Sequence, residues 1–565
     1  MKRLIFVLLW ACFLPSIAIH SYAQALRHVV TNPINLNYRF QPDSPSRREA
    51  ADPVIEYFKG YYYLFASKSG GYWQSKDLAE WTYIPCKTIA TMEDYAPAVL
   101  TLGDTLYFTA SSGNTKIYKN SHPEVDHWEL VDTKFMYNQH DPAFYKDDDG
   151  KVYFYWGCSD VDPIMGVEVD PKKGFQAIGK PKALIEHHGD KFGWEVPGKN
   201  NEELRQGWNE GPCMIKYNGR YYLQYAAPGT QYRIYGDGIY VGDNPLGPFQ
   251  YIEDNPFSFK PGGFIGGAGH GYTFKDKYGN YWHVASMTIS VRHVFERRLG
   301  LFPVAVSNRG GFYTRTAFSD YPYYIPDKKV DFDKTDCGMN WNLLSYKKKI
   351  SSSSFLPGFE PTNANDEQIE TWWSACTGNK GEWLQIDLGS LCEVNALQVN
   401  FADHNFSVYA PHGPVIYQYL IEGSSTGNEW TCLIDERKNQ KDAPHTLHTL
   451  KSPVKVRYLK IINMKSMSGC FSMFDFRVFG KGSGNIPAKV EGFHAFRDKK
   501  DGRAFHFIWN SQHNVTGYLL KWGTQKDRLT HSVMVFDNHY EARFFNKDSK
   551  YYFSILAFNE NGISQ

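Results

Sequence analysis

The sequence has little that would direct the chain to a charged partner or into a membrane. Among its 565 residues, 61 Lys and Arg are balanced by 60 Asp and Glu, so the formal net charge is +1. Without an excess of one sign there is no bulk field to attract nucleic acid or an anionic surface. Its one long hydrophobic run falls short of the roughly 20 apolar residues that span a bilayer. We therefore expect a neutral partner, no nucleic acid and no transmembrane segment.

Cysteine is also scarce. The nine cysteines are widely spaced, with no CxxC pair and no zinc-ligand pattern. The sequence therefore predicts no zinc site of the usual spacing, and the pattern of any disulfides stays open because connectivity does not follow from spacing.

The amino-terminal segment has the features of a signal peptide. Lys2 and Arg3 precede the hydrophobic run from Leu4 to about Ile19, and the small residues that follow suit signal peptidase. We expect residues 1–23 to be removed and the mature chain to be exported, either to the periplasm or outside the cell. Because the apolar run continues beyond Cys12, that cysteine fits a lipid anchor poorly.

The composition favours many short strands joined by tight turns. Aromatic residues make up 16% of the chain and only 21% is charged, alongside 48 Gly and 29 Pro. This mixture disfavours helical bundles, coiled coils and disorder. At roughly 150 residues per domain, the length predicts three or four domains.

A degenerate repeat covers residues 45–325. Each copy has an apolar stretch, a turn that contains Gly and a Tyr-rich stretch, which is the pattern of a β-hairpin. The copies open at Ala51, Tyr95, His140, Asn209 and Gly269. Units too small to bury their own faces must stack on one another, so the repeat predicts a five-bladed β-propeller at residues 24–335.

Two further all-β units are expected after the propeller. A boundary near residues 330–345, with a basic, Ser-rich seam at Lys347–Ser354, separates the propeller from a second unit at 345–481. Gly482–Asn485 has the composition of a linker. Residues 486–565 alternate apolar and polar side chains at the period of a β-sandwich.

Three acidic residues occupy matching positions in the repeats. Asp52 and Asp141 each precede a Pro, and Glu210 precedes Gly-Pro; the other two copies have Ala96 and His270 there. In a propeller these positions surround the central axis. Burial there, and the like charges of neighbouring carboxylates, raise the pKa of each acid. Glycoside hydrolysis needs one protonated and one ionised carboxyl group, so these acids are candidates for that chemistry. A turn or capping role is the alternative for each acid alone.

Residues 45–325 resemble glycoside hydrolase family 43, five-bladed propellers that act on plant polysaccharides containing arabinose, xylose or galactose. The resemblance rests on ordered motifs: ADPVIEYFKGYYYLFAS from Ala51, SKDLAEW from Ser75, YAPAV from Tyr95, HDPAFYKDDDGKVY from His140, NEGPCMIKYNGRYYLQY from Asn209, GHG from Gly269 and RRLGLFPV from Arg297.

The resemblance implies roles for individual residues in an inverting mechanism. Asp52 would be the general base, Glu210 the general acid, and Asp141 the residue that tunes the pKa of the acid. His270 would lie near the axial site where many relatives hold a calcium ion or a water molecule, and Arg298 would reach the sugar or Asp141. The chemistry itself requires no cofactor.

Sugar-binding candidates are His140 and three aromatic residues, Trp73, Tyr95 and Trp156. Aromatic rings can stack on a sugar face, although blade packing is the alternative role. The second copy has Tyr-Ala-Pro-Ala where relatives usually have a Trp and an Asp, so the sugar specificity does not carry over from the family.

The second unit resembles a discoidin-like (coagulation factor C-terminal type) module, through TWWSA, EWLQIDLG, YLIEGSSTGNEW and VRYLKI, and such modules often bind sugars in bacterial hydrolases. The third resembles fibronectin type III, through GYLLKWG and YYFSILAFNENG. The combined expectation is an exported polysaccharide hydrolase similar to α-L-arabinofuranosidases or β-xylosidases. Alternatives are an exo-galactanase, a galactofuranosidase, a non-catalytic glycan-binding propeller, or a structural protein.

Overall fold

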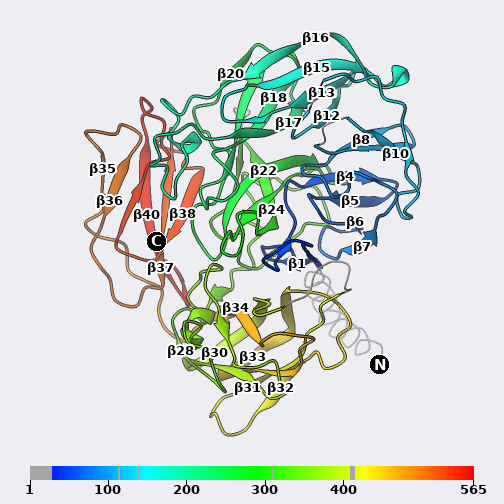
Figure 1. Ribbon diagram of the computed structural model, residues 1–565. Helices are drawn as coiled ribbons and strands as arrows, with labels where there is room; N and C mark the ends of the chain where they lie inside the picture. Colours follow the sequence, from blue (N-terminus) through cyan, green and yellow to red (C-terminus); the bar gives the residue numbers. More distant parts are fainter. Residues whose placement is uncertain (1–27, 112–114, 138, 308–310, 407–413) are drawn as a thin grey trace, which may run out of the picture.

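The structure of the chain is almost entirely β. The computed structural model describes residues 28–111, 115–137, 139–307, 311–406 and 414–565 (Figure 1). Within these ranges the helical elements are three short 3-10 turns, η1 (Pro171–Lys173), η2 (Gly193–Glu195) and η3 (Pro361–Ala364). The all-β prediction is confirmed. The predicted signal peptide, residues 1–23, lies outside the described residues, and no described helix is long and apolar enough to cross a membrane.

Five antiparallel sheets follow one another along residues 54–314. The first contains β4 (Val54–Phe58), β5 (Tyr61–Phe65), β6 (Gly71–Ser75) and β7 (Thr82–Pro85). The second contains β8 (Ala98–Leu102), β9 (Thr105–Thr109), β10 (Tyr118–Asn120) and β11 (Glu129–Leu130). The third contains β12 (Ala143–Lys146), β13 (Val152–Trp156), β15 (Ile164–Asp170) and β16 (Gln176–Ile185).

The fourth sheet has six strands and the fifth has four. The fourth contains β14 (Cys158–Ser159), β17 (Asn209–Tyr217), β18 (Arg220–Ala227), β19 (Gly236–Gly242), β20 (Phe249–Tyr251) and β21 (Ser258–Phe259). The fifth contains β22 (Gly266–Lys275), β23 (Tyr281–Thr288), β24 (Arg297–Val306) and β25 (Phe312–Thr314). Strands β4, β8, β12, β17 and β22 each contact the next, and β22 contacts β4, so the five sheets close into a ring.

Two short strand pairs lie beside this ring. One joins β1 (Val29–Val30) to β26 (Tyr323–Tyr324), and the other joins β2 (Arg39–Phe40) to β3 (Arg48–Glu49). The first pair brings the start of the described chain against the segment that leaves the fifth sheet. The second pair carries Arg48 and Glu49, whose side chains are buried.

The second unit is one eight-stranded antiparallel sheet that curls around its own core. Its main path runs β27 (Asn342–Leu343), β34 (Ser472–Lys481), β30 (Trp383–Phe401), β33 (His445–Lys465), β31 (Gln418–Ser424) and β32 (Thr431–Asp435). Two further strands, β28 (Lys349–Ser352) and β29 (Trp373–Ser374), pair with β30 and β34. The predicted seam at Lys347–Ser354 therefore contains a strand of this sheet, because all four residues of β28 pair with β30.

The third unit consists of two antiparallel sheets. One contains β35 (His494–Arg497), β36 (Phe505–Ile508) and β39 (His539–Ala542). The other contains β38 (His531–Val535), β37 (Gly517–Gly523), β40 (Tyr552–Asn559) and β41 (Gly562–Ile563). Phe507, Leu520 and Ala557 belong to one buried cluster in this unit.

The three units pack directly against one another (Figure 1). The third unit shares a buried cluster with the fourth sheet, where the Phe259 and Phe544 rings lie 4.9 Å apart. The predicted linker is also held in place: the N–H of Gly482 donates to the Glu560 carbonyl at 2.8 Å and that of Gly484 to Asn561 Oδ1 at 2.9 Å. This segment, predicted as a linker, therefore has its backbone bonded to the third unit.

Candidate active site

One backbone position recurs at the inner end of every sheet in the ring. It has positive φ in all five: 51° at Asp52, 50° at Ala96, 49° at Asp141, 59° at Gly211 and 45° at His270. Four of these residues are not glycine, and a left-handed conformation costs such residues roughly 1–2 kcal/mol. A strained conformation at four of the five positions indicates that the ring itself imposes it.

Hydrogen bonds between neighbouring sheets hold these positions. The N–H groups donate at 2.8 Å to a side chain of the adjoining sheet, in the pairs Asp52 to Ser286 Oγ, Ala96 to Ser67 Oγ, Asp141 to Ser111 Oγ and His270 to Asp237 Oδ1. The same backbone turn that joins the sheets therefore brings Asp52, Asp141 and His270 to one place.

Glu210 reaches the site from a different position in the repeat. The residue equivalent to Asp52 and Asp141 is Gly211, and a Cβ there would lie 2.6 Å from Cδ2 of His270. The His270 ring therefore leaves no room for a side chain at Gly211. The carboxylate of this sheet comes from the preceding residue, Glu210.

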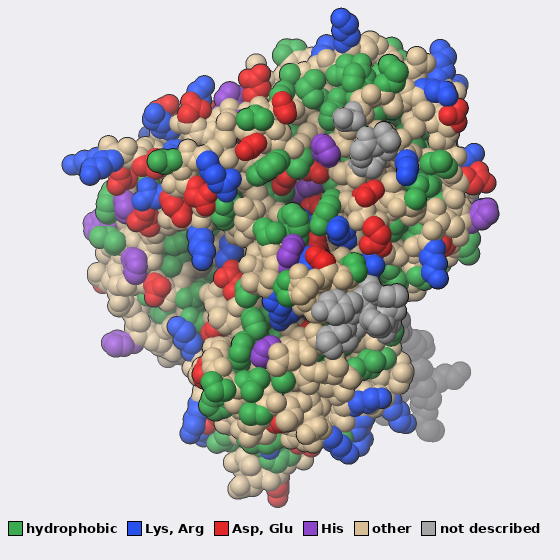
Figure 2. Space-filling view, viewed as in Figure 1, with side chains coloured by type: hydrophobic (Ala, Val, Ile, Leu, Met, Phe, Trp, Pro, Cys, Tyr) green, Lys and Arg blue, Asp and Glu red, His purple; other side chains and the backbone are tan. Residues whose placement is uncertain are grey.

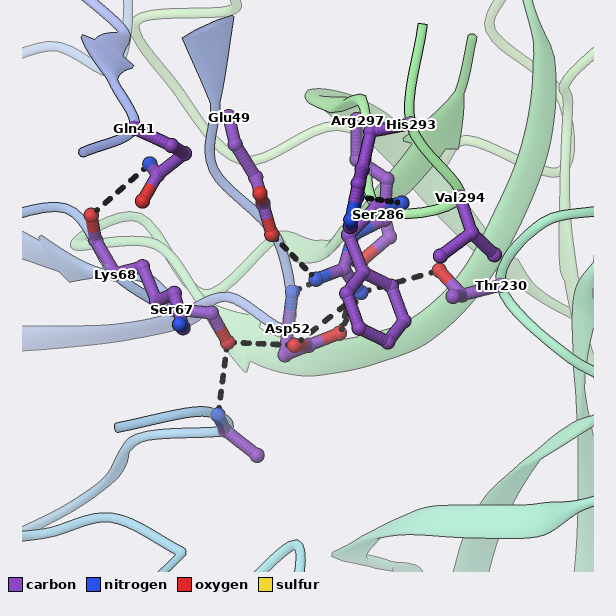
Figure 3. Close-up of polar contacts among 12 residues, drawn as sticks. Gln41, Glu49, Asp52, Ser67, Lys68, Thr230, Ser286, His293, Val294 and Arg297 are labelled. Carbon is purple, nitrogen blue, oxygen red and sulfur yellow. Dashed lines mark hydrogen bonds and ion pairs between the residues drawn. The ribbon is translucent and has the colours of Figure 1, made fainter. Parts of the chain in front are cut away.

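Asp52 lies among donors that favour its ionised form (Figure 3). Ser67 Oγ donates to Oδ2 at 2.5 Å, Ser286 Oγ lies 3.4 Å from Oδ1, and Arg297 Nη1 lies 3.1 Å from Oδ1. Burial raises the pKa of Asp52, but Arg297, His270 and the two hydroxyl groups outweigh burial and bring the pKa below its usual value. Asp52 is thus an ionised carboxylate, suited to accept a proton.

His270 connects Asp52 to Asp141. Its Nδ1 lies 3.3 Å from Asp52 Oδ1 and 3.5 Å from Asp141 Oδ2. Burial lowers the pKa of His270, but the charges of Asp52, Asp141 and Glu210 raise it further than burial lowers it, so the pKa is above its usual value. The imidazole therefore tends to carry a positive charge between the two carboxyl groups.

Asp141 favours its protonated form. Burial raises its pKa, and the charges of Glu210 and Asp52 add to this against the opposing effect of His270, which brings the pKa to about 7. Asp141, Glu210 and Cys158 offer ligand atoms that all lie within 4.8 Å of one another. The charge of Glu210 is therefore close enough to favour the proton on Asp141.

Glu210 accepts hydrogen bonds from two further side chains. Tyr235 Oη donates to Oε1, and Cys158 Sγ lies 3.2 Å from Oε2. Burial and the nearby carboxyl groups of Asp141 and Glu210 raise the pKa of the Cys158 thiol, so this cysteine remains protonated and donates. Both oxygens of Glu210 are thus oriented by the protein. The site holds a depressed and a raised carboxyl pKa side by side, as acid–base catalysis requires.

Several residues that surround the acids could not be found from the sequence motifs. Glu49 pairs with Arg297 at 3.0 Å, and Ser67, Ser286, Tyr235 and Cys158 bond the carboxylates directly. The signal that the serines share in the sequence is repetition: Ser67, Ser111 and Ser286 each follow an Ala at the same point of a repeat.

Arg298 does not reach the site, and the prediction for it is wrong. It is completely buried, donates from Nη1 to the Arg48 carbonyl at 2.7 Å and from Nε to His445 Nε2 at 2.9 Å. Consecutive residues of a strand point to opposite faces. The neighbouring residue Arg297 therefore faces Asp52, while Arg298 faces the second unit.

The aromatic candidates lie in different surroundings. Trp73 is 1% exposed and donates from Nε1 to Asn37, so it packs inside the first sheet and the prediction of sugar contact is corrected. Tyr95 is half-buried beside Phe295, at 5.4 Å between ring centroids. Trp156 is also half-buried and stacks on Tyr137. His140 is exposed next to Asp141.

The calcium or water site expected at His270 stays a prediction, and the donors grouped around Glu210 are too few to complete a calcium site by themselves. Ca²⁺ takes 6–8 oxygen ligands, whereas Asp141, Glu210 and Cys158 supply two carboxyl groups and a protonated thiol. His270 Nδ1 is already directed at two carboxylates. A cavity of about 20 Å³ lies further along the axis between Pro53, Pro97, Pro142 and Pro212, which is room for about one water molecule.

The second unit contacts the segment that precedes Arg297. Arg292 donates to the Ala402 carbonyl, and its guanidinium lies 5.0 Å from the Trp372 ring centroid. Phe295, three residues on, lies 4.9 Å from the Arg297 guanidinium. The residue that holds Asp52 is thus flanked by contacts to the second unit on both sides.

A ring of sheets whose inner ends bring together carboxyl groups of opposed pKa is suited to acid–base chemistry. Residues 46–310 match the model of Glycosyl hydrolases family 43, and residues 349–475 match that of the F5/8 type C domain. The chain therefore carries a glycosyl hydrolase family 43 domain followed by a discoidin-like F5/8 type C domain, as expected.

Curated relatives resemble parts of the chain. A Beta-xylosidase of Xylanibacter ruminicola is 30% identical over 20% of this chain and 39% of its own length. An Arabinoxylan arabinofuranohydrolase of Paenibacillus polymyxa is 34% identical over 26% of this chain and 22% of its own length. The chain thus spans well under two thirds of these relatives. Among solved structures, the GH43 BlXynB protein from Bacillus licheniformis is 17% identical with a TM-score of 0.40, covering 95% of this chain and 97% of that chain.

Proposed function

We propose that the chain is a glycoside hydrolase that removes arabinose or xylose units from xylan or arabinoxylan by an inverting mechanism. The observation that carries this proposal is the arrangement of Asp52, Asp141 and Glu210 around His270. The family 43 match and the names of the two relatives support the substrate class.

The proposed reaction uses the opposed protonation states of the site. Asp52, ionised beside Arg297, takes a proton from water as the water oxygen attacks the anomeric carbon. Glu210 gives a proton to the leaving glycosidic oxygen as the carbon–oxygen bond breaks. Asp141 holds a proton close to Glu210, because the pKa of Asp141 is raised to about 7 and the two carboxyl groups are near each other. Attack and departure on opposite faces invert the anomeric configuration.

The architecture and location complete the proposal. The closed ring supports a five-bladed propeller, since each of its five sheets begins at one sequence repeat. The two packed sheets of residues 494–563 support a fibronectin type III fold for the third unit. The charged, apolar and small residues of 1–23 support export to the periplasm or outside the cell.

The test is hydrolysis of a panel of aryl pentosides and galactosides by the wild type, Asp52→Asn and Glu210→Gln. Each substitution should lower kcat/KM for the cleaved glycoside at least ~100-fold. Glu56→Gln is the matched control, because Glu56 of β4 is also an enclosed carboxyl group. It is bonded to Thr101 and Tyr272 and makes none of the contacts of Asp52. Proton NMR of the first product should show the inverted anomer.

A non-catalytic glycan-binding protein is the opposing hypothesis. It predicts that the wild type cleaves no member of the panel, yet binds xylo- and arabinoxylo-oligosaccharides as tightly as both variants. That result would refute the proposed hydrolase. Cleavage with retention of the anomeric configuration would refute the assignment of Asp52 as a base that activates water.

A further inference from the structure

A second cavity is lined by residues of all three units of the chain and by none of the carboxyl groups of the axis. Its volume is about 660 Å³, within the range of roughly 300–1,000 Å³ that small-molecule sites have. Walls come from the end of the fifth sheet, from residues 333–343 that lead into the second unit, and from β37 and the 527–532 segment of the third unit.

One part of the wall is apolar and aromatic. Trp341, Phe318, Met339, Leu519 and Phe558 belong to one hydrophobic cluster and line the cavity. Flat apolar surfaces of this kind are where a sugar ring packs its C–H face.

The wall also carries three cations, Arg315, Lys521 and Arg528, and the guanidinium of Arg528 lies 5.4 Å from the Tyr313 ring centroid. Among the described residues of the wall, Arg315 and Lys521 are the two without a partner ring or carboxylate. Arg315 donates from Nη2 to the Asp333 carbonyl at 2.9 Å, and its Nε is buried without a hydrogen-bond partner. Burial lowers the pKa of Lys521, and the positive charge of Arg315 lowers it further. Within the described part of the chain, neither side chain forms an ion pair with a carboxylate.

Among the residues that the structure describes, Arg298 likewise has no carboxylate partner and donates to two carbonyls and to His445. Four other enclosed cations of the protein are paired differently. Each holds a carboxylate directly: Arg48 with Asp403 at 2.8 Å, Arg297 with Asp52 at 3.1 Å, Arg477 with Glu367 at 2.7 Å and Lys260 with Asp320 at 3.1 Å. Two like charges in a half-enclosed space repel each other unless an anion lies between them. The cavity therefore provides the cationic half of a site without its anion.

The acidic residues of the wall do not supply that anion. Asp333 Oδ1 accepts from Tyr313 Oη at 2.7 Å, and Asp336 Oδ1 accepts from the Gly338 N–H at 2.9 Å. Asp527 is exposed to solvent. A carboxylate brought by a ligand would have Arg315 and Lys521 as its partners, in charge-assisted hydrogen bonds.

We propose that this cavity binds an acidic sugar, namely a uronic acid unit of a glycan. Its carboxylate lies between Arg315 and Lys521, and its ring packs against the aromatic wall at Trp341. This inference depends on the proposed function only for the class of ligand, a glycan. It adds a binding site for an acidic branch to an enzyme whose axis acts on neutral pentose units.

The experiment is isothermal titration of the full chain with D-glucuronic acid and D-galacturonic acid, at concentrations up to about 10 mM. D-glucose, acetate and inorganic phosphate are the comparison ligands. A uronic acid should bind at least tenfold more tightly than glucose, which lacks the carboxylate, and than acetate or phosphate, which lack the sugar ring.

Substitutions at the two cations test where the uronic acid binds. Lys521→Gln and Arg315→Gln should each weaken uronate binding at least tenfold, while Lys526→Gln, an exposed lysine of the same segment, should leave it unchanged. Asp52→Asn should abolish hydrolysis and keep uronate binding, so failure of the axial site and failure of this one are distinguishable.

Three results would overturn the proposal. They are no heat with either uronic acid, equal affinity for glucose, acetate or phosphate, and uronate binding that persists in both Lys521→Gln and Arg315→Gln. Circular dichroism and thermal unfolding would establish that the variants are folded before binding is compared.

Discussion

Arg298 donates from Nε to Nε2 of His445 at 2.9 Å, and this bond joins the hydrolase domain to the F5/8 type C domain. Both side chains are fully buried, and Nδ1 of His445 is in turn bonded to Asn400 Oδ1 at 2.9 Å. Burial and the charges of Arg298 and Arg48 keep the pKa of His445 well below its usual value. A neutral imidazole is therefore the acceptor for a buried guanidinium whose backbone neighbour, Arg297, holds Asp52.

His445→Ala should lower kcat at least about tenfold with a smaller change in KM, because loss of the acceptor frees Arg298 and shifts Arg297. Steady-state kinetics on the best aryl glycoside would measure the change. His445→Gln, whose amide oxygen can accept from Arg298, should restore most of kcat.

His448→Ala is the matched control for that prediction. His448 is a half-buried histidine of the same strand, bonded to Tyr419 and not to the hydrolase domain. If His448→Ala lowers kcat as much as His445→Ala, or if a crystal structure of His445→Ala shows Arg297 unmoved against Asp52, the bridge has no part in positioning the site.

Arg297→Gln should move the acidic limb of the pH profile to higher pH. Asp52 acts as a base only when ionised, and Arg297 is the strongest of the groups that lower its pKa. Without the guanidinium the pKa of Asp52 rises, so kcat/KM should fall at a pH where the wild type is still active. The pH dependence of kcat/KM reports this group in the free enzyme.

Arg457→Gln provides the control for Arg297→Gln. Arg457 forms a bidentate pair with Asp387 in the F5/8 type C domain, at 2.7 and 2.8 Å, and its loss should leave the profile in place. If the acidic limb of the Arg297→Gln profile does not move, Asp52 is not the group whose ionisation this limb reports.

Asp141→Asn should change how stability depends on pH. The folded pKa of Asp141, about 7, lies above its unfolded value, so the folded state binds the proton more tightly. The stabilisation from this group is therefore present at low pH and is lost as pH rises through about 7. Asparagine does not ionise, so the variant should gain stability relative to the wild type between pH 5 and pH 8, on the order of 1–3 kcal/mol.

Thermal or urea unfolding at both pH values measures this difference. His270 contributes in the same direction, because its folded pKa is also raised and Asp141 is one cause of that shift. A difference between wild type and variant that is the same at pH 5 and pH 8 would contradict the raised pKa.

Gly211→Ala should be much more harmful than Gly219→Ala. Both glycines have positive φ, so each alanine costs roughly 1–2 kcal/mol of backbone strain. At Gly219 nothing lies within 4 Å of the added Cβ, whereas at Gly211 it would lie 2.6 Å from the His270 ring. We expect Gly211→Ala to lose about 1–3 kcal/mol more and to displace His270, with a large loss of kcat.

Unfolding free energies of the two variants, measured beside kinetics, check this expectation. Equal destabilisation of Gly211→Ala and Gly219→Ala would mean that the His270 ring can yield without cost.

Local patterns in the sequence were sufficient to predict the strands and to find the acidic residues of the site. The repeats predict hairpins because a turn glycine and alternating apolar residues act over a few residues, and β4 and β5 lie where they were expected. Asp52 and Asp141 could be found because both precede Pro at the same point of a repeat. Neither inference depends on contacts between distant segments.

Other predictions failed because contacts with distant segments decide where those side chains lie. Which of Arg297 and Arg298 faces Asp52 depends on the pairing of β24 with β23, in which Arg297 lies opposite Thr288. Trp73 has the composition of a sugar platform, yet Asn37 and the first sheet enclose it. The glycines after residue 481 have the composition of a linker, and only the third unit determines that they are bonded.

The sequence by itself determined an all-β chain, its repeats and the carboxyl groups available for catalysis, since these follow from periodicity and turn chemistry within short segments. Tertiary structure decided which protonation state each carboxyl group favours and how the domains support them. Those properties arise from burial and from charges far apart in the chain: Asp52 meets Arg297 across 245 positions, and Arg298 meets His445 across 147.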